Sequence, residues 1–152
     1  MFITYSPNPK YSNDLTGEGA RINGGRWNHI LTPCVYASEN RALALLEYTV
    51  NVNIEDIPRA LCITAIEIPD DGIEEVKQSD LPGDWKLVPA PASTKDFGTN
   101  LLKAAARPIL KIPSTIIPKE FNYLLNPMHV DSRNFKIASV EDFVYDVRIK
   151  SL

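Results

Sequence analysis

The sequence predicts a single α+β domain that occupies residues 1–152. A chain of 152 residues is long enough to bury a core and too short for two domains. The apolar fraction of 44% and the charged fraction of 23% are typical of globular proteins. Strand-like and helix-like segments both occur, but they do not alternate regularly enough for a parallel sheet. We therefore expect small mixed or antiparallel sheets with flanking helices.

The N-terminal part of the chain predicts a loop followed by one short strand. Residues 1–25 are rich in Asn, Gly, Pro and Ser, which favours a loop with little regular structure. Residues 33–37 have strand character. Because side chains alternate along a strand, Cys34 and Tyr36 should share one face and Val35 should lie on the other.

The next segment predicts an amphipathic helix from residue 39 to about residue 52. Its apolar residues recur at helical spacing. Ser38 is expected to be the N-cap. On this helix Glu47 lies at the edge of the apolar stripe, where a carboxylate can line a cleft without entering the core.

The second half of the chain predicts mainly strands. The strand-like segments are 60–68, 108–113, 135–138 and 143–149. Ser114 directly follows the segment 108–113. A second helix is expected from residue 94 to about residue 106, with Ser93 as its N-cap. Residues 121–129 are expected to be irregular.

Composition and motifs exclude several classes of function. A net charge of −3 and a pI near 5.4 argue against a dedicated nucleic-acid-binding protein. No secretory leader or membrane-spanning apolar run is visible, so we expect a cytoplasmic protein in which Cys34 and Cys62 are reduced core residues. Dinucleotide, Walker and nucleophile-elbow motifs do not occur. His29 and His129 have no companion ligand spacing, so no metal site is expected.

Four residues are candidates for a functional site, although each has an ordinary structural explanation when it is taken alone. A helical Glu47 is usually a solvated flank, and Arg26 is most often a surface ion-pair partner. Tyr36 is explained as a half-buried strand aromatic, and Ser114 after a proline as a turn residue.

Taken together, these residues lie in motifs that resemble the RES domain, a family of bacterial toxins named for its arginine, glutamate and serine. The matching segments are GEGA at 17–20, GGRWN at 24–28, PCVYAS at 33–38, ALALLE at 42–47 and KIPSTIIPKEFNYLLNPMHVDS at 111–132. The resemblance covers nearly the whole chain. GGRWN and NYLLNP in this order and spacing are hard to obtain by chance.

The resemblance implies a core fold similar to that of ADP-ribosyltransferases. It also implies cleavage of the nicotinamide–ribose bond of NAD+, which is a substrate and not a resident cofactor. By motif, the implied active-site residues are Arg26, Tyr36, Glu47 and Ser114. Asn122 and Asn126 are implied to shape the pocket.

Each residue type suits this chemistry. A carboxylate such as Glu47 stabilises the ribosyl cation. The Arg26 guanidinium can grip the pyrophosphate with two hydrogen bonds. Tyr36 can stack on nicotinamide or bond a ribose, and Ser114 can position NAD+ through its hydroxyl.

The resemblance leaves the acceptor and the partners open. Water, phosphate or a protein can accept the ADP-ribosyl group, so a glycohydrolase, a phosphorylase and a mono-ADP-ribosyltransferase remain alternatives. A catalytically weak module that binds a partner is a further alternative. The implied partner is an Xre-like helix-turn-helix antitoxin of a type II toxin–antitoxin pair, with a homo-oligomer within that complex left open. Direct binding to nucleic acid or membrane is not expected.

Two positions depart from the family pattern. Leu31 occupies a position where many members have glycine, in a turn before the strand. Tyr5 stands where members often have an arginine in a strand. If that arginine contacts phosphate, the affinity or the acceptor could differ in this chain. Neither departure touches the four core positions.

Overall fold

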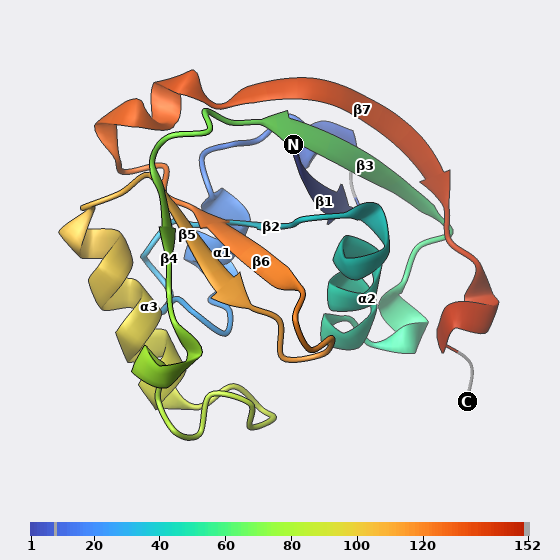
Figure 1. The fold of residues 1–152 in the computed structure, drawn as a ribbon. Helices are drawn as coiled ribbons and strands as arrows, with labels where there is room; N and C mark the ends of the chain where they lie inside the picture. The colour runs from blue at the N-terminus through green and yellow to red at the C-terminus, as the bar shows by residue number, and fades with distance from the viewer. Residues whose placement is uncertain (8, 151–152) are drawn as a thin grey trace.

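The computed structural model describes residues 1–7 and 9–150, which form one curved sheet with helices packed on it (Figure 1). The strands are β1 (Phe2–Ser6), β2 (Val35–Ser38), β3 (Ala60–Glu67), β4 (Ile73–Glu75), β5 (Ile109–Pro113), β6 (Phe121–Leu125) and β7 (Lys136–Val144). The α-helices are α1 (Glu18–Asn23), α2 (Arg41–Asn51) and α3 (Ala92–Ala104). The predicted α+β class is confirmed.

The strand order in the sheet is β4-β5-β6-β2-β1-β3-β7. Only the β4–β5 pair is parallel among the described strands, and every other pair is antiparallel. β2 lies near the middle and joins β4, β5 and β6 on one side to β1, β3 and β7 on the other. In Figure 1, β3 and β7 arch over β1 while β5 and β6 run in a different direction.

The core is divided by the faces of this sheet. One apolar cluster contains Trp27, Trp85, Leu102 of α3, Leu110 and Leu124. The cluster on the opposite face contains Phe2, Val35, Ile109 and Tyr123, among others. A third, smaller cluster packs Ala44 of α2 against Ile3, Ile63 and Ala65. Trp27 is therefore a core residue, and α2 is seated on β1 and β3 through its apolar side.

Strand alternation determines which residues share a face with the candidate site. Cys34 and Tyr36 belong to the cluster under α3 and Val35 to the opposite one, which confirms the predicted alternation. In the register of β2 and β6, Tyr36 lies opposite Leu124 and Ser38 lies opposite Asn122. Side chains two residues apart on a strand point to the same side. Tyr36, Ser38 and Asn122 therefore face the same way.

Three sequence predictions of secondary structure are wrong. Residues 1–25 contain β1 and α1, because the FITYS segment has the β-branched and aromatic residues that suit a central strand. Residues 121–125 form β6, since pairing with both β2 and β5 overrides the turn-like asparagines. The last two predicted strands are one strand, β7, followed by the 3-10 turn Val147–Lys150.

The predicted helix caps are also wrong. Asn40, not Ser38, is the N-cap of α2, because its side chain accepts a hydrogen bond from Leu43 N. The Ser38 hydroxyl instead donates to Asn122. In α3, Ser93 lies inside the first turn, and its hydroxyl donates to Asp84 at 2.6 Å.

Candidate active site

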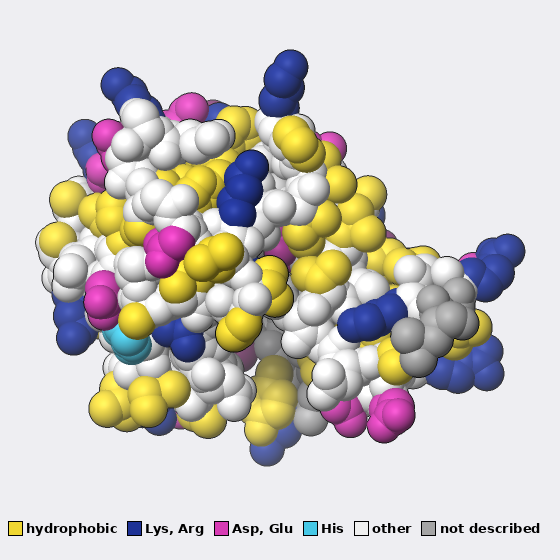
Figure 2. Space-filling view, turned by 90° about the horizontal axis from the view of Figure 1, so that it is seen from below, with side chains coloured by type: hydrophobic (Ala, Val, Ile, Leu, Met, Phe, Trp, Pro, Cys, Tyr) yellow, Lys and Arg dark blue, Asp and Glu magenta, His cyan; other side chains and the backbone are white. Residues whose placement is uncertain are grey.

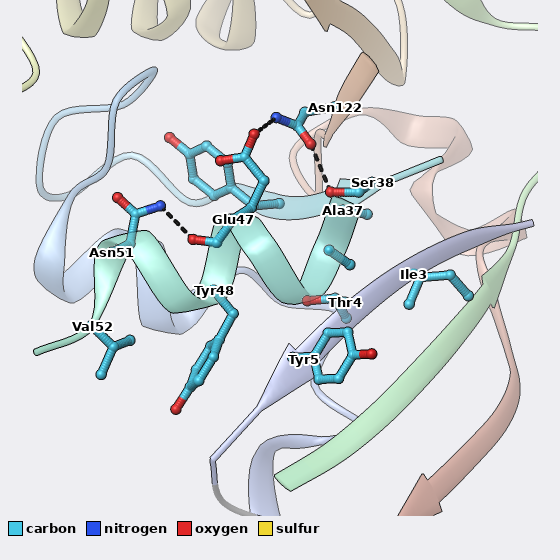
Figure 3. A pocket seen from close by; sticks show the side chains of 12 residues that line it. Ile3, Thr4, Tyr5, Ala37, Ser38, Glu47, Tyr48, Asn51, Val52 and Asn122 are labelled. Atoms are coloured by element: carbon cyan, nitrogen blue, oxygen red, sulfur yellow. Dashed lines mark hydrogen bonds between the residues drawn. The ribbon is translucent and has the colours of Figure 1, made fainter. Parts of the chain in front are cut away.

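The carboxylate of Glu47 is held by two hydrogen-bond donors from the sheet. Ser114 Oγ donates to Glu47 Oε1 at 2.9 Å, and Asn122 Nδ2 donates to the same oxygen. Asn122 Oδ1 in turn accepts from Ser38 Oγ at 2.6 Å, so the chain of bonds runs from β2 through β6 to α2 (Figure 3). Two donors on one oxygen fix the direction of the carboxylate.

The sheet explains why these residues meet. Asn122 is opposite Ser38 on one side of β6 and opposite Ile112 on the other side. Ser114 directly follows β5, and its side chain is 4% exposed. The Ser114 oxygen accepts from the backbone N–H groups of Ile116 and Ile117 at 3.0 and 3.2 Å. With its lone pairs occupied, the hydroxyl is left to donate to Glu47, so Ser114 acts on this carboxylate.

Tyr36 contributes its ring to the site and its hydroxyl to the fold. The hydroxyl accepts from Trp27 N at 3.0 Å and donates to Asn28 Oδ1 at 2.7 Å. Burial raises the pKa of this phenol well above its usual value, so it stays protonated. A Cβ at Gly25 would lie 2.6 Å from the Tyr36 oxygen, which explains the glycine there.

Arg26 is anchored to a loop that is distant in the sequence. Its Nη1 donates to Trp85 O and to Leu87 O, both at 2.9 Å. These bonds tie the 24–28 turn to the segment that follows the 3-10 turn Gln78–Asp80. The guanidinium has five donors in a planar fork, so these two bonds leave donors for a ligand.

Two adjoining hollows meet at Glu47. The large hollow, with a volume of 660 Å³, lies between the 23–27 turn, the end of α2 and residues 113–116, with Lys86 and Val88 also lining it. The small hollow, of 230 Å³, lies between residues 3–5 of β1, residues 36–38 of β2 and α2. The residues common to both are Tyr36, Glu47, Asn51 and Asn122.

The two hollows differ in charge. Arg26 and Lys86 line the large hollow together with Glu47. Among the described residues that line the small hollow, Glu47 is the only charged one, and tyrosines 5, 36 and 48 supply aromatic surface. In Figure 3, Glu47 reaches from α2 toward Asn122, while Tyr48 leaves the helix on the side of Tyr5. Figure 2 shows a central hollow on the lower face of the molecule, bordered by hydrophobic side chains and single Lys or Arg side chains.

The structure brings most of the sequence-predicted site residues together. Arg26, Tyr36, Glu47 and Asn122 line the large hollow, and Ser114 donates a hydrogen bond to Glu47. Asn126 does not join them. It is 1% exposed, and its side chain donates to Leu102 O at 2.8 Å and accepts from Met128 N, so it holds α3 against the end of β6.

Sequence reasoning missed Ser38, Asn51 and Lys86. The alternation that pairs Tyr36 with Ser38 on one strand face was a signal for Ser38. Nothing local in the sequence indicates Lys86, because contacts distant in the sequence hold its segment at the site, namely the bonds from Arg26 and the packing of Trp85 against Trp27.

Other reactive groups lie outside this site. Cys34 and Cys62 are buried free thiols, as expected, and burial raises the pKa of Cys34. Within residues 1–7 and 9–150, no group of three His, Cys, Asp or Glu side chains is arranged to hold a metal ion. No helix in the same residues is long and apolar enough to cross a membrane.

Comparison with known proteins identifies the family. The family model of the RES domain matches residues 5–146. The chain belongs to the RES-domain toxin family. A relative from Sphingobium sp. (strain YBL2), named Prs ADP-ribosylating toxin, is 37% identical over 141 residues, covering 91% of this chain and 88% of that protein.

Other members of the RES family match over similar lengths. Proteins named Toxin Res from Yersinia enterocolitica and Pseudomonas putida are 37% and 36% identical, covering 89% and 90% of this chain and 90% and 92% of theirs. A chain in the crystal structure of the M. tuberculosis MbcT–MbcA toxin–antitoxin complex superposes with a TM-score of 0.71. That match covers 94% of this chain and 83% of the other at 15% identity, and it shows a common fold.

The two departures from the RES pattern have structural consequences. Leu31 adopts a left-handed conformation with φ of 74° and is 75% exposed, so a residue with a Cβ stands where glycine would fit without strain. Tyr5 lines the small hollow, and its hydroxyl donates to Arg41 O at 3.3 Å. A neutral aromatic ring therefore stands in the small hollow of this RES domain.

Proposed function

We propose that this RES domain is a toxin that breaks the nicotinamide–ribose bond of NAD+. The observation that carries the proposal is the position of Glu47, whose carboxylate is fixed by Ser114 and Asn122 where the two hollows meet. A carboxylate that is oriented in this way can stabilise the positive charge that develops on the ribose as the bond breaks.

The sizes and charges of the hollows support one orientation of NAD+. The large hollow has the volume of an ordinary ligand site and offers Arg26 and Lys86 to the pyrophosphate. The small hollow has room for a single ring and is lined by aromatic side chains and Glu47. Both features suit the cationic nicotinamide ring. In this orientation the scissile bond lies beside Glu47.

The departure of nicotinamide requires few further catalytic groups. Nicotinamide leaves as a neutral molecule from a cationic ring, so the reaction requires no strong general acid. Tyr36 can offer only its ring to NAD+, because its hydroxyl is bonded to Trp27 and Asn28. Ser114 acts by orienting Glu47 and not by contacting NAD+.

We propose water as the acceptor. The other residues that line the small hollow are neutral, and Arg26 and Lys86 are needed for the pyrophosphate. A phosphate ion beside Glu47 would meet a like charge. The name of the Sphingobium relative, Prs ADP-ribosylating toxin, favours a protein acceptor as the second candidate.

One experiment separates these acceptors. Purified protein is incubated with NAD+ alone, with added phosphate and with cell lysate, and the products are identified by mass spectrometry. We expect nicotinamide and ADP-ribose at a rate that phosphate does not change. ADP-ribose phosphate would indicate a phosphorylase, and a labelled lysate protein a transferase. No loss of NAD+ in any arm would contradict the proposed function and favour a module that only binds a partner.

We also propose that the toxin acts in the cytoplasm and is blocked by an antitoxin of the Xre-like helix-turn-helix type. The support is that the MbcT–MbcA structure, which shares the fold, is a toxin–antitoxin complex. Expression of this chain alone should arrest bacterial growth while cellular NAD+ falls. Co-expression of a neighbouring helix-turn-helix protein should restore growth, and the two should co-purify, in a complex whose mass shows whether it holds more than one toxin chain. Growth arrest with unchanged NAD+ would argue for another target.

A further inference from the structure

Helix α2, which carries Glu47, ends without the groups that commonly close a helix. Its last turn has no basic residue, and Val52 follows it in an extended conformation with φ of −117°. The last carbonyl groups of a helix have no partner within the helix and need one elsewhere. The partners of these carbonyls therefore determine how firmly the end of α2 is held.

The partners come from Asn51 and from the other end of the chain. Asn51 Nδ2 donates to Glu47 O at 2.7 Å. Lys150 Nζ donates to Thr49 O at 2.8 Å and also to Val52 O. Lys150 lies at the end of the turn Val147–Lys150, which Figure 1 shows on the same side of the molecule as α2. Its positive charge also interacts favourably with the helix dipole at this end.

A second, buried bond joins the same two segments. The hydroxyl groups of Thr49 and Tyr145 lie 3.2 Å apart, and both residues are 4% exposed. Tyr145 N donates to Arg59 O at 2.8 Å, which fixes Tyr145 at the start of β3. Because a buried hydroxyl without a partner is costly, this bond is not easily exchanged for water.

We propose that residues 145–150 position Glu47 for catalysis by holding the last turn of α2 against the sheet. Ser114 and Asn122 fix the carboxylate, while Tyr145 and Lys150 fix the backbone from which Glu47 and Asn51 project. Neither Tyr145 nor Lys150 lines either hollow, so both are positioning residues and do not contact NAD+. The effect on turnover rests on the proposed function, whereas the effect on the helix does not.

The test compares Lys150→Met, Lys150→Arg and the matched control Lys136→Met. Lys136 is exposed at the far end of β7, so its replacement makes the same chemical change away from α2. We expect Lys150→Met to lower kcat about tenfold, because a small misplacement of a catalytic group is costly, while KM changes little. Backbone hydrogen exchange should quicken in residues 48–52. Lys150→Arg keeps the charge and the donors, so its kcat and its hydrogen exchange in residues 48–52 should be close to those of the wild-type protein.

The outcomes separate this proposal from the proposed function. The positioning role would be overturned if Lys150→Met left kcat unchanged. It would also be overturned if Lys150→Arg lowered kcat as much as Lys150→Met does. If the wild-type protein does not cleave NAD+, the proposed function fails. Hydrogen exchange alone then tests whether residues 145–150 hold the last turn of α2. Faster exchange at residues 48–52 in Lys150→Met but not in Lys136→Met would support it, and equal exchange would overturn it.

Discussion

The two sides of the site, one around Glu47 and one around Arg26, are built differently. Glu47 lies in the regular helix α2, and its partners Ser114 and Asn122 are placed by the register of β5 and β6. Arg26 lies in an irregular segment that contains the left-handed residues Gly24 and Leu31, and its bonds go to backbone carbonyls of another loop.

Under the proposed function, this difference corresponds to two chemical tasks. A group that stabilises a developing charge must keep a fixed direction and distance, because its effect depends on preorganisation. A group that grips a pyrophosphate can follow the ligand over a short distance and still donate both bonds. We therefore expect changes on the Glu47 side to affect turnover and changes on the Arg26 side to affect binding or stability.

The largest expected effect is that of Glu47→Gln. The substitution keeps the size and the acceptor oxygen for Ser114 and Asn122 but removes the negative charge. Because the charge matters mainly in the transition state, kcat for NAD+ cleavage should fall about 100-fold. NAD+ affinity and melting temperature should change little. Glu55→Gln, an exposed change just beyond the same helix, is the control. An active Glu47→Gln protein would mean that the charge of Glu47 does not take part in catalysis.

Asn122→Ala should have the next largest effect. The variant removes one donor to Glu47 and leaves Ser38 without its partner. The carboxylate can then rotate away from the site, and kcat should fall about tenfold, the size of one hydrogen bond to a charged group. Steady-state kinetics provide the measurement. A rise in KM at constant kcat would instead place Asn122 among the residues that bind the substrate.

Local patterns in the sequence predicted α2, α3, β3 and β5 close to their observed bounds, whereas β1 and β6 were missed. The helix of Glu47 and the alternation in β2 follow from local patterns, and both are confirmed. β6 was not predicted, because Asn122 and the Asn-Pro pair that follows it favour a turn locally. Its strand conformation depends on pairing with two neighbours that are distant in the chain. β1 was missed for a related reason, since its short segment lies in a turn-rich region.

The names of the site residues came from the family resemblance, whereas their contacts could not be predicted. Ser114 and Glu47 are 67 residues apart in the sequence and meet at 2.9 Å only because β5 ends beside α2. Asn126 belongs to the same motif as Asn122 but holds α3 instead. Spacing along the sequence does not distinguish these two asparagines, because the distinction arises from strand register.

On the other side of the comparison, Arg26→Lys should affect binding. Lysine keeps the charge but cannot reproduce the planar fork that reaches Trp85, Leu87 and a pyrophosphate together. We expect KM for NAD+ to rise about fivefold, the size of a lost hydrogen bond, with kcat little changed. Arg133→Lys, at an exposed position outside both hollows, is the control. A fall in kcat without a change in KM would contradict the division of tasks.

The smallest expected effect is that of Leu31→Gly, which should raise stability and leave kinetics unchanged. The left-handed conformation of Leu31 costs a residue with a Cβ about 1 kcal/mol more than glycine. Part of this gain is lost because glycine is more flexible in the unfolded chain, so the melting temperature should rise by about 2 °C. Leu31→Ala removes the exposed side chain but keeps the Cβ, so it should give no increase. If alanine stabilises as much as glycine, the exposed apolar side chain is the cause and the backbone of this segment is not strained. If either variant changes kcat, the irregular segment that carries Arg26 affects turnover as well as binding.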